Sequence, residues 1–312
     1  MKTKGMRVTI PGRGKEHKNL VLDNPVIAAS GTFGFGREYA EYIDLDQLGA
    51  IAVKGLTPAA REGNPPPRIV ETEMGIINSI GLQNPGVETF IAEEMPFLNQ
   101  YKTKVIANIS GNSVEEFVLM SQRLSMENGI DALEVNVSCP NIHRGGEVFA
   151  TNPEMVEMIT SAVRKVTDLT IIVKLSPNVT DIGSIARRAE AGGADAVSLI
   201  NTVLAMAIDI HEQKPVLKQV FGGLSGPAVK PIALRQVWQV YQSVNIPIIG
   251  MGGIMNGNDA IEFILAGASA ISVGTGNFIN PTACVDVLKG IRNYMDKHQI
   301  DDITQLVGKA HQ

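Results

Sequence analysis

The stretch PIIGMGGIMNGNDAIEFILAGASAISVGTGNF, residues 247–278, contains the pattern that decides the fold. It begins with a short apolar run at 247–251, continues with helical periodicity at 256–266, and ends in a second apolar run at 270–273. Asn256 is a favoured first residue, because an asparagine side chain accepts hydrogen bonds from the first free backbone N–H groups of a helix. A strand, a helix and another strand in this order are typical of a parallel sheet whose strands are joined by helices.

The same unit recurs along the chain. Eight apolar runs are expected to form strands, at 25–30, 50–54, 105–109, 132–137, 171–175, 196–200, 247–251 and 270–273. Helical patterns occur at 88–100, 113–128, 152–166, 181–191, 231–243, 256–266 and 281–298, with a shorter one near 37–43. Eight strand and helix pairs predict an α/β fold, a (β/α)8 TIM barrel, with residues 1–312 forming one domain.

An open, doubly wound sheet is the alternative fold. It should carry the spacing GxGxxG at its first strand-to-helix turn, but Gly31, Gly34 and Gly36 are spaced GxxGxG, which favours the barrel. The segment around residues 8–22 is expected to form an N-terminal hairpin that covers the bottom of the barrel. Two longer stretches, 139–151 and 203–230, are expected to be loop insertions at the active face, since long loops in this fold commonly carry the site.

The composition excludes several classes of function. The chain is 44% hydrophobic and 19% charged, which provides a large core, and its net charge of -5 argues against nucleic acid as a partner. No apolar run approaches the roughly 18 residues of a membrane span, so we expect a cytoplasmic protein without a membrane partner. Cys139 and Cys284 are the only cysteines, too few for a disulfide framework or a four-cysteine cluster, and we expect no metal site.

Polar and small residues stand where the eight expected strands end. In chain order they are Ser30, Lys54, Asn108, Asn136 with Ser138 and Cys139, Lys174, Asn201 with Thr202, Gly252 with Gly253, and Gly274 with Thr275. Because the active site of this fold lies at the carboxyl ends of the strands, we expect these residues to line it.

The last two strands end in GMGGIMNG (250–257) and GTGNF (274–278). Small residues here allow backbone amides to approach an anion, and the loops after the seventh and eighth strands are the usual phosphate site of a barrel. A phosphorylated ligand is therefore expected. The motif leaves open whether that ligand is a substrate or a cofactor such as flavin mononucleotide (FMN).

Two lysines, Lys54 and Lys174, each end a hydrophobic run and should direct an ammonium group toward the barrel mouth. One interpretation is a lysine beside N1 and O2 of a flavin, where it stabilises the anionic reduced ring. The other is a desolvated lysine that forms a Schiff base, as in an aldolase.

Cys139 follows the fourth strand in NVSCPNIHRGG (136–146), where Pro140 interrupts regular structure. A thiol near its reference pKa of about 8.5 is a workable general base at this position, whereas Cys284 lies in a helical pattern and is expected to pack in the core. The segment NSIGLQNPG (78–86) is rich in amide and hydroxyl groups and can fold over the mouth to bind a small polar substrate; by itself the pattern fits an ordinary turn-rich loop equally well.

These motifs together are recognisable. KG at 54, NSIGLQNPG at 78, ANISG at 107, NVSCPN at 136, IVKLSPN at 172, INT at 200, GGLSGPAVKP at 222, GMGGI at 250 and VGTG at 273 resemble, in order and spacing, the dihydroorotate dehydrogenases, flavin enzymes of pyrimidine synthesis. Position 139 holds a cysteine, as in the cytosolic class 1 enzymes that the chain resembles; the membrane-associated class has a serine there. GLQNPG and NIHRGGEVFATNPE resemble the catalytic subunit of class 1B, which is linked to NAD.

The resemblance implies specific roles. Cys139 is the base that removes the C5 proton of dihydroorotate while hydride leaves C6 for flavin N5. Substrate contacts are implied for Lys54, Asn78, Ser79, Ile80, Gly81, Leu82, Asn136, Asn201 and Thr202. One FMN per chain is implied, bound by Ser30, Lys54, Gly55, Asn108, Asn136, Lys174, Ile200, Gly226, Gly252, Gly253, Gly274 and Thr275.

The electron acceptor requires a second protein. The chain has no dinucleotide fingerprint and too few cysteines for an iron-sulfur cluster, so NAD must be bound by a partner if it is the final acceptor. The class 1B resemblance implies an electron-transfer subunit that carries FAD and a 2Fe-2S centre. Two such subunits and a catalytic homodimer would form a heterotetramer.

Four alternatives remain at this point. Two are close, a fumarate-reducing class 1A enzyme and a dihydropyrimidine dehydrogenase-like flavoprotein acting on uracil or thymine. The others are a redox-free aldolase or synthase that uses Lys174 for a Schiff base, and a binding scaffold without catalysis.

Overall fold

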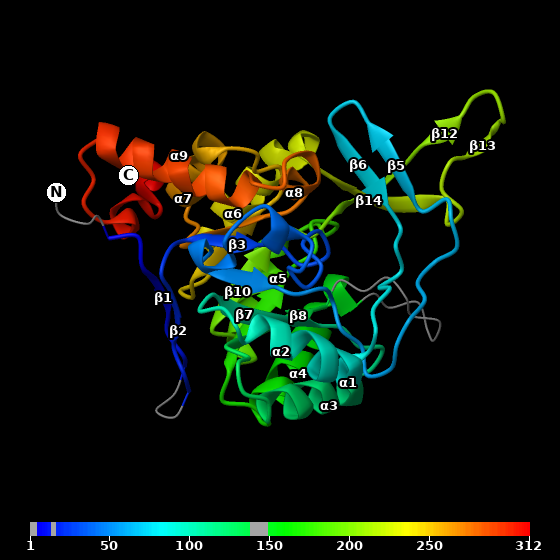
Figure 1. Ribbon diagram of the computed structural model, residues 1–312, viewed down its shortest axis with the longest axis horizontal. Coiled ribbons are helices and arrows are strands. Elements are labelled where there is room, and N and C mark those ends of the chain that lie inside the picture. The colour runs from blue at the N-terminus through cyan, green and yellow to red at the C-terminus, as the bar shows by residue number, and fades with distance from the viewer. Residues whose placement is uncertain (1–4, 14–16, 138–148) are drawn as a thin grey trace.

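A closed barrel of eight parallel strands forms the centre of the computed structural model, which describes residues 5–13, 17–137 and 149–312 (Figure 1). In spatial order the strands are β10 (Ala196–Leu199), β15 (Ile248–Met251), β16 (Ala270–Val273), β3 (Val26–Ala28), β4 (Ala50–Ala52), β7 (Lys104–Ile109), β8 (Ala132–Asn136) and β9 (Thr170–Lys174). All eight lie inside or at the predicted runs, which confirms the barrel.

The barrel strands are buried on both faces, and this explains why their sequences are continuous apolar runs. Every residue of β9, β10, β15 and β16 is buried. Side chains pointing inward fill the barrel and those pointing outward pack beneath the helices, so neither face meets water.

Helices surround the barrel. They are α3 (Val114–Ser125), α4 (Pro153–Arg164), α5 (Ile182–Ala191), α6 (Lys230–Tyr241), α7 (Gly257–Leu265), the short α8 (Gly276–Ile279) and α9 (Ala283–Lys297). Ser113, Asn152, Asp181 and Asn256 cap four of them, each side chain accepting a backbone N–H of the first turn. None of the described helices combines the length and apolarity that crossing a bilayer requires.

Two predicted helices differ from regular α-helix. The pattern at 88–100 forms α1 (Val87–Thr89), a π-helical turn (Phe90–Glu94) and α2 (Met95–Leu98). Pro96 follows the π turn and lacks the N–H that a regular helical bond needs. The pattern near 37–43 forms only a single 3-10 turn, Tyr39–Glu41, so the expected helix is wrong there.

Further 3-10 turns lie at Leu45–Gln47, Phe149–Thr151, Pro227–Val229, Ile303–Leu306 and Lys309–His311. The last two form the carboxyl-terminal end of the chain. Both pack beside α7. Gly5, at the start of the described chain, forms an isolated parallel bridge with Asp302, which precedes the first of them.

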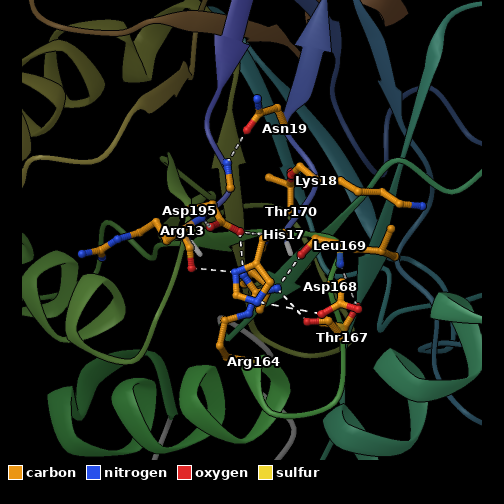
Figure 2. A network of polar contacts seen from close by, with 12 residues as sticks. Arg13, His17, Lys18, Asn19, Arg164, Thr167, Asp168, Leu169, Thr170 and Asp195 are labelled. Carbon is orange, nitrogen blue, oxygen red and sulfur yellow. Dashed lines mark hydrogen bonds and ion pairs between the residues drawn. The ribbon is translucent and has the colours of Figure 1, made fainter. Parts of the chain in front are cut away.

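The expected N-terminal hairpin is present. β1 (Val8–Ile10) and β2 (Leu20–Leu22) pair antiparallel, and Figure 2 shows the polar network that attaches them to the amino-terminal end of the barrel. The buried carboxylate of Asp195 accepts the backbone N–H of Arg13 at 2.7 Å and an N–H of the Arg164 guanidinium at 2.8 Å. This network lies at the end opposite the strand termini where the site is expected.

A second sheet stands at the carboxyl ends of the barrel strands, where the sequence predicts only loops. We call it the upper sheet; its antiparallel order is β11 (Val203–Met206), β14 (Phe221–Ser225), β6 (Gly75–Asn78) and β5 (Ile69–Thr72). The two-residue strands β12 (Ile208–Asp209) and β13 (Lys214–Pro215) extend from it, away from the barrel (Figure 1). β6 and β14 are far apart in sequence, so their pairing leaves no local pattern.

Candidate active site

Three predicted site residues meet inside the carboxyl end of the barrel. Ser30, Asn108 and Lys174 come from the ends of β3, β7 and β9, and all three contact the carboxylate of Glu134 in β8. Asn108 Nδ2 donates to Glu134 Oε2 at 2.6 Å, and Lys174 Nζ donates to Ser30 Oγ at 3.0 Å. The structure therefore joins residues that are up to 144 positions apart in the sequence.

Glu134 is a functional candidate that the sequence analysis missed. It is 3% exposed and also accepts a hydrogen bond from Ser198 Oγ at 2.8 Å. The available signal was a single carboxylate inside the apolar run ALEVN of β8. Such a residue is rarely buried unless it is paired.

Asn108 presents an unsatisfied acceptor. Its Oδ1 is buried and has no hydrogen-bond partner in the described part of the chain. A Cβ placed on Gly55 would lie 2.9 Å from this oxygen, so only glycine leaves the approach open. A buried polar atom without a partner is costly, and a ligand with an N–H group would satisfy it. A flavin ring, which carries such a donor, fits this position.

Small residues form a cradle where β15 and β16 end. Gly226 has φ +103° and Gly253 φ +78°, conformations that glycine adopts readily, and a Cβ on Gly253 would lie 2.9 Å from Gly226 O. Thr275 Oγ1 donates to Ser225 Oγ at 2.8 Å beside them. A Cβ on Gly252 would lie 3.2 Å from Ile200 Cγ1, which brings the end of β10 to the same place. Backbone amides in such a concavity suit a phosphate group.

The predicted substrate residues converge from three segments. Asn201 Nδ2 lies 3.5 Å from Asn136 Oδ1, which joins the ends of β10 and β8. Asn78 Nδ2 donates to Gly223 O at 3.2 Å, and the side chain of Thr202 lies where a Cβ on Gly223 would stand. Amide groups from separate strands are therefore gathered at one end of the barrel. They can pair with a small ligand that carries both carbonyl and N–H groups.

The NSIGLQNPG loop is held in place by an asparagine that the sequence analysis did not select. Asn64 N donates to Ile80 O and Asn64 Nδ2 to Ser79 O, each at 2.9 Å. Gly81 and Leu82 then take left-handed conformations, with φ of +77° and +55°. Ser79 Oγ is buried without a partner in the described chain, as expected of a group that awaits a ligand.

Lys54 is the second lysine of the site. Burial lowers its pKa from the ordinary lysine value, and the nearby positive charges of Arg68 and Lys174 lower it further. An anionic ligand would relieve this repulsion. Lys54 also lines a cavity of about 760 Å³ with Gly34, Phe35, Glu38, Ala60, Arg61, Glu62, Gln83, Asn84 and Pro85.

Of the two cysteines, only Cys284 lies among the described residues. Cys139, the predicted base, lies outside the described residues, and so does Ser138. Cys284 is buried in the core, and burial raises the pKa of its thiol to about 12. It therefore packs as a neutral thiol, as the sequence analysis expects.

The chain is a (β/α)8 barrel with a glycine-rich cradle after its last two strands. Amides, lysines and a buried carboxylate lie together at its mouth, an arrangement typical of barrel enzymes that bind their ligands at this end. Within that class, a model of the dihydroorotate dehydrogenase family matches residues 15–295. The chain belongs to this family.

Curated relatives match this chain in sequence along nearly its whole length. The chain is 56% identical to the "Dihydroorotate dehydrogenase B (NAD(+)), catalytic subunit" of Alkaliphilus metalliredigens over 303 residues, 97% of this chain and 98% of the relative. Proteins of the same name from Thermoanaerobacter pseudethanolicus and Desulforamulus reducens are 57% and 58% identical, over 93% and 94% of this chain and 95% and 96% of theirs.

Proposed function

We propose that this chain is the catalytic subunit of an NAD-linked dihydroorotate dehydrogenase. It would oxidise (S)-dihydroorotate to orotate with FMN, in the de novo biosynthesis of UMP. The observation that carries this proposal is the convergence of Ser30, Asn108 and Lys174 beside a glycine cradle. Family membership and the names of the relatives support it.

FMN would lie with its phosphate in the cradle of Gly226, Gly252, Gly253, Gly274 and Thr275, and with its ring near Gly55 and Asn108. Asn108 Oδ1, which has no partner among the described residues, would accept a ring N–H, and the lysines would stabilise negative charge on the reduced ring. When bound, FMN supplies the acceptor for hydride from C6 of dihydroorotate.

The chain's own residues would position the substrate and move one proton. Asn78, Asn136, Asn201 and Thr202 offer amide and hydroxyl groups to the carbonyl and N–H groups of the pyrimidine ring, and Lys54 offers positive charge to its carboxylate. The Cys139 thiolate would take the proton from C5 as hydride leaves C6, so a C5–C6 double bond forms and the two electrons leave with the hydride.

A partner subunit would carry the electrons to NAD. The relatives are named catalytic subunits of NAD(+) enzymes, while this chain lacks a dinucleotide fingerprint and has two cysteines. We assign FAD and a 2Fe-2S centre to the partner. Two partners and a catalytic dimer would form the heterotetramer.

The upper sheet offers a surface for the catalytic dimer. Leu204 and Met206 of β11 are exposed, and Phe221 of β14 lies directly opposite Met206. Ile208 in β12 and Ile210 just after it, outside the upper sheet itself, are exposed as well. An exposed apolar surface of this kind is typical of permanent homodimers. Lys214 and Glu212 beside it form an ion pair with each other at 3.2 Å, so these two charges do not oppose the approach of a second copy of the same surface.

Turnover with an artificial electron acceptor tests the proposed reaction. The purified chain reconstituted with FMN should oxidise dihydroorotate and leave dihydrouracil and dihydrothymine unchanged, because these lack the carboxylate that Lys54 would bind. Preference for the uncharged dihydropyrimidines would assign the chain to the dihydropyrimidine dehydrogenase-like alternative. A colourless protein whose lysine is trapped on a sugar phosphate by borohydride would support the aldolase alternative.

A further inference from the structure

Glu134 connects more of the candidate site than any residue selected from the sequence. Its Oε2 accepts hydrogen bonds from Asn108 Nδ2 at 2.6 Å, from Ser30 Oγ at 3.3 Å and from Lys174 Nζ at 3.5 Å. Its Oε1 accepts one from Ser198 Oγ at 2.8 Å. Both carboxylate oxygens are thus occupied by donors from four other barrel strands or strand ends.

The contact with Glu134 determines which atom of Asn108 is left for a ligand. An ionised carboxylate is an acceptor only, so it can pair with the amide nitrogen and not with the amide oxygen. Asn108 Oδ1 must then point elsewhere, and it is the buried oxygen beside Gly55 for which the described residues provide no hydrogen-bond donor. A residue without negative charge at 134 would allow the amide to turn over.

Hydrogen bonds to Ser30 and Glu134 also fix the orientation of the Lys174 ammonium group. Two of its three N–H donors are directed to Ser30 and Glu134, which leaves one for a ligand as far as the described residues are concerned. Its side chain is 7% exposed, and an ammonium group so deeply buried requires a counter-charge. Glu134 is the carboxylate that lies within ion-pair distance of it among the described residues.

Glu134 also affects the net charge beside the expected flavin site. Lys54 and Lys174 bring two positive charges to the flavin side of the site, and Glu134 offsets one of them. Arg68 adds a further positive charge near Lys54, so the site stays net positive, and loss of the Glu134 charge would raise the positive charge beside the ring by one unit. Removing the negative charge of Glu134 should favour an anionic flavin adduct.

We propose that Glu134 is a positioning residue for the flavin: it holds the Asn108 amide and the Lys174 ammonium in the orientation that the ring requires and limits the positive charge beside the ring. This inference rests on the proposed function, since it assumes that FMN binds at this site. Glu134 itself needs no contact with substrate or cofactor.

Glu134→Gln keeps the shape of the side chain and removes its charge, and Ser198→Ala is the matched control. Ser198→Ala removes the hydrogen bond to the other oxygen of the same carboxylate without changing the side that faces Asn108 and Lys174. For each protein we would measure FMN affinity by fluorescence quenching, thermal stability without FMN, and the affinity of the bound flavin for sulfite, which adds to N5 as an anion.

Glu134→Gln should weaken FMN binding by roughly tenfold or more, the effect expected for a charge-assisted hydrogen bond, and should tighten sulfite binding by a similar factor. Ser198→Ala should lower thermal stability with little change in either affinity. Glu134→Asp, which keeps the charge, should fall between wild type and Glu134→Gln. Combined with Lys174→Met, Glu134→Gln should cost less than the sum of the two single changes.

Unchanged FMN and sulfite affinities in Glu134→Gln would overturn the inference. So would effects that match those of Ser198→Ala and follow thermal stability alone, because these indicate a purely structural carboxylate. Failure of the wild-type chain to bind FMN would instead contradict the proposed function, so the two failures are distinguishable.

Discussion

Gly274 lies beside Ala29 without crowding: a Cβ added to Gly274 would lie 3.7 Å from the Cβ of Ala29, an ordinary van der Waals distance. This glycine also has no left-handed φ. Neither crowding nor backbone conformation within the chain explains it, in contrast to Gly226 and Gly253 in the same cradle. A ligand that occupies the space beside Thr275 would explain why no side chain stands there.

Gly274→Ala should therefore fold normally and bind FMN poorly. We expect the melting temperature of the cofactor-free protein to stay within about 2 °C of wild type, since the added methyl group has room. FMN affinity should fall by roughly tenfold or more, because the methyl group would take the place of the ligand. Calorimetry and FMN titration check both. Wild-type FMN affinity in this variant would place the phosphate elsewhere.

Lys54 should lower the stability of the cofactor-free chain. Its pKa is lowered in the folded state, chiefly by burial, so the charged form costs free energy at neutral pH. This cost is present below the folded pKa and is relieved as the pH rises through it toward the unfolded value. Lys54→Met should be more stable by about 1 kcal/mol at neutral pH, and the gain should shrink in alkali.

The same variant should lose affinity for orotate by about tenfold or more, because the carboxylate loses its cation. Lys104→Met is the control: Lys104 forms a partly exposed ion pair with Asp131 at 3.0 Å, far from the strand ends that form the site. Its removal should leave orotate affinity unchanged and should not stabilise the chain. Thermal melts over a pH series and orotate titrations provide the measurements. A Lys54→Met variant that is less stable than wild type would contradict the claim that the buried charge of Lys54 costs free energy.

The exposed apolar residues of the upper sheet and of the adjoining strand β12 should hold two copies of the chain together. Replacing Ile208 and Ile210 together by serine should convert a dimer into a monomer, as judged by light scattering, because both side chains are largely exposed and their apolar area would be covered only in the dimer. Met126→Ser is the control, since Met126 is 71% exposed at the end of α3, outside the upper sheet. A wild-type monomer, or a dimer that persists in the double variant, would contradict this assignment.

The partner requirement predicts a simple acceptor pattern. The chain alone should reduce artificial acceptors with dihydroorotate but form no NADH, and addition of an FAD and iron-sulfur subunit should restore NADH formation. Steady-state absorbance of NADH measures the outcome. Robust NADH formation by the single chain would contradict the role of a partner, and efficient fumarate reduction would place the protein in class 1A.

The barrel could be predicted from the sequence because each of its strands is an apolar run with a helical pattern beside it. Strand-end residues such as Lys174 and Asn108 could be predicted for the same reason, since the fold brings the ends of parallel strands together. The roles expected for the loop residues follow from the family resemblance, because hydrophobic periodicity does not indicate the role of a loop residue.

The upper sheet and Glu134 could not be predicted in this way. β6 pairs with β14 through Asn78 and Gly223, so the sheet depends on a contact between distant segments that leaves no periodic pattern in either. Glu134 occupies an inward position of a strand, where an apolar residue is expected. Its burial makes sense only with Lys174 and Asn108 beside it, and these come from neighbouring strands.

The central claim is that dihydroorotate reduces a flavin on this chain with Cys139 as the base. Anaerobic stopped-flow mixing of the FMN-loaded chain with dihydroorotate tests it most directly. Wild type should lose its visible flavin absorbance rapidly, Cys139→Ala should keep FMN but react roughly 10² to 10⁴ times more slowly, and Cys284→Ala, which alters only the core thiol, should react at nearly the wild-type rate. Flavin that dihydroorotate leaves oxidised in the wild type, or that Cys139→Ala reduces at the wild-type rate, would contradict the account.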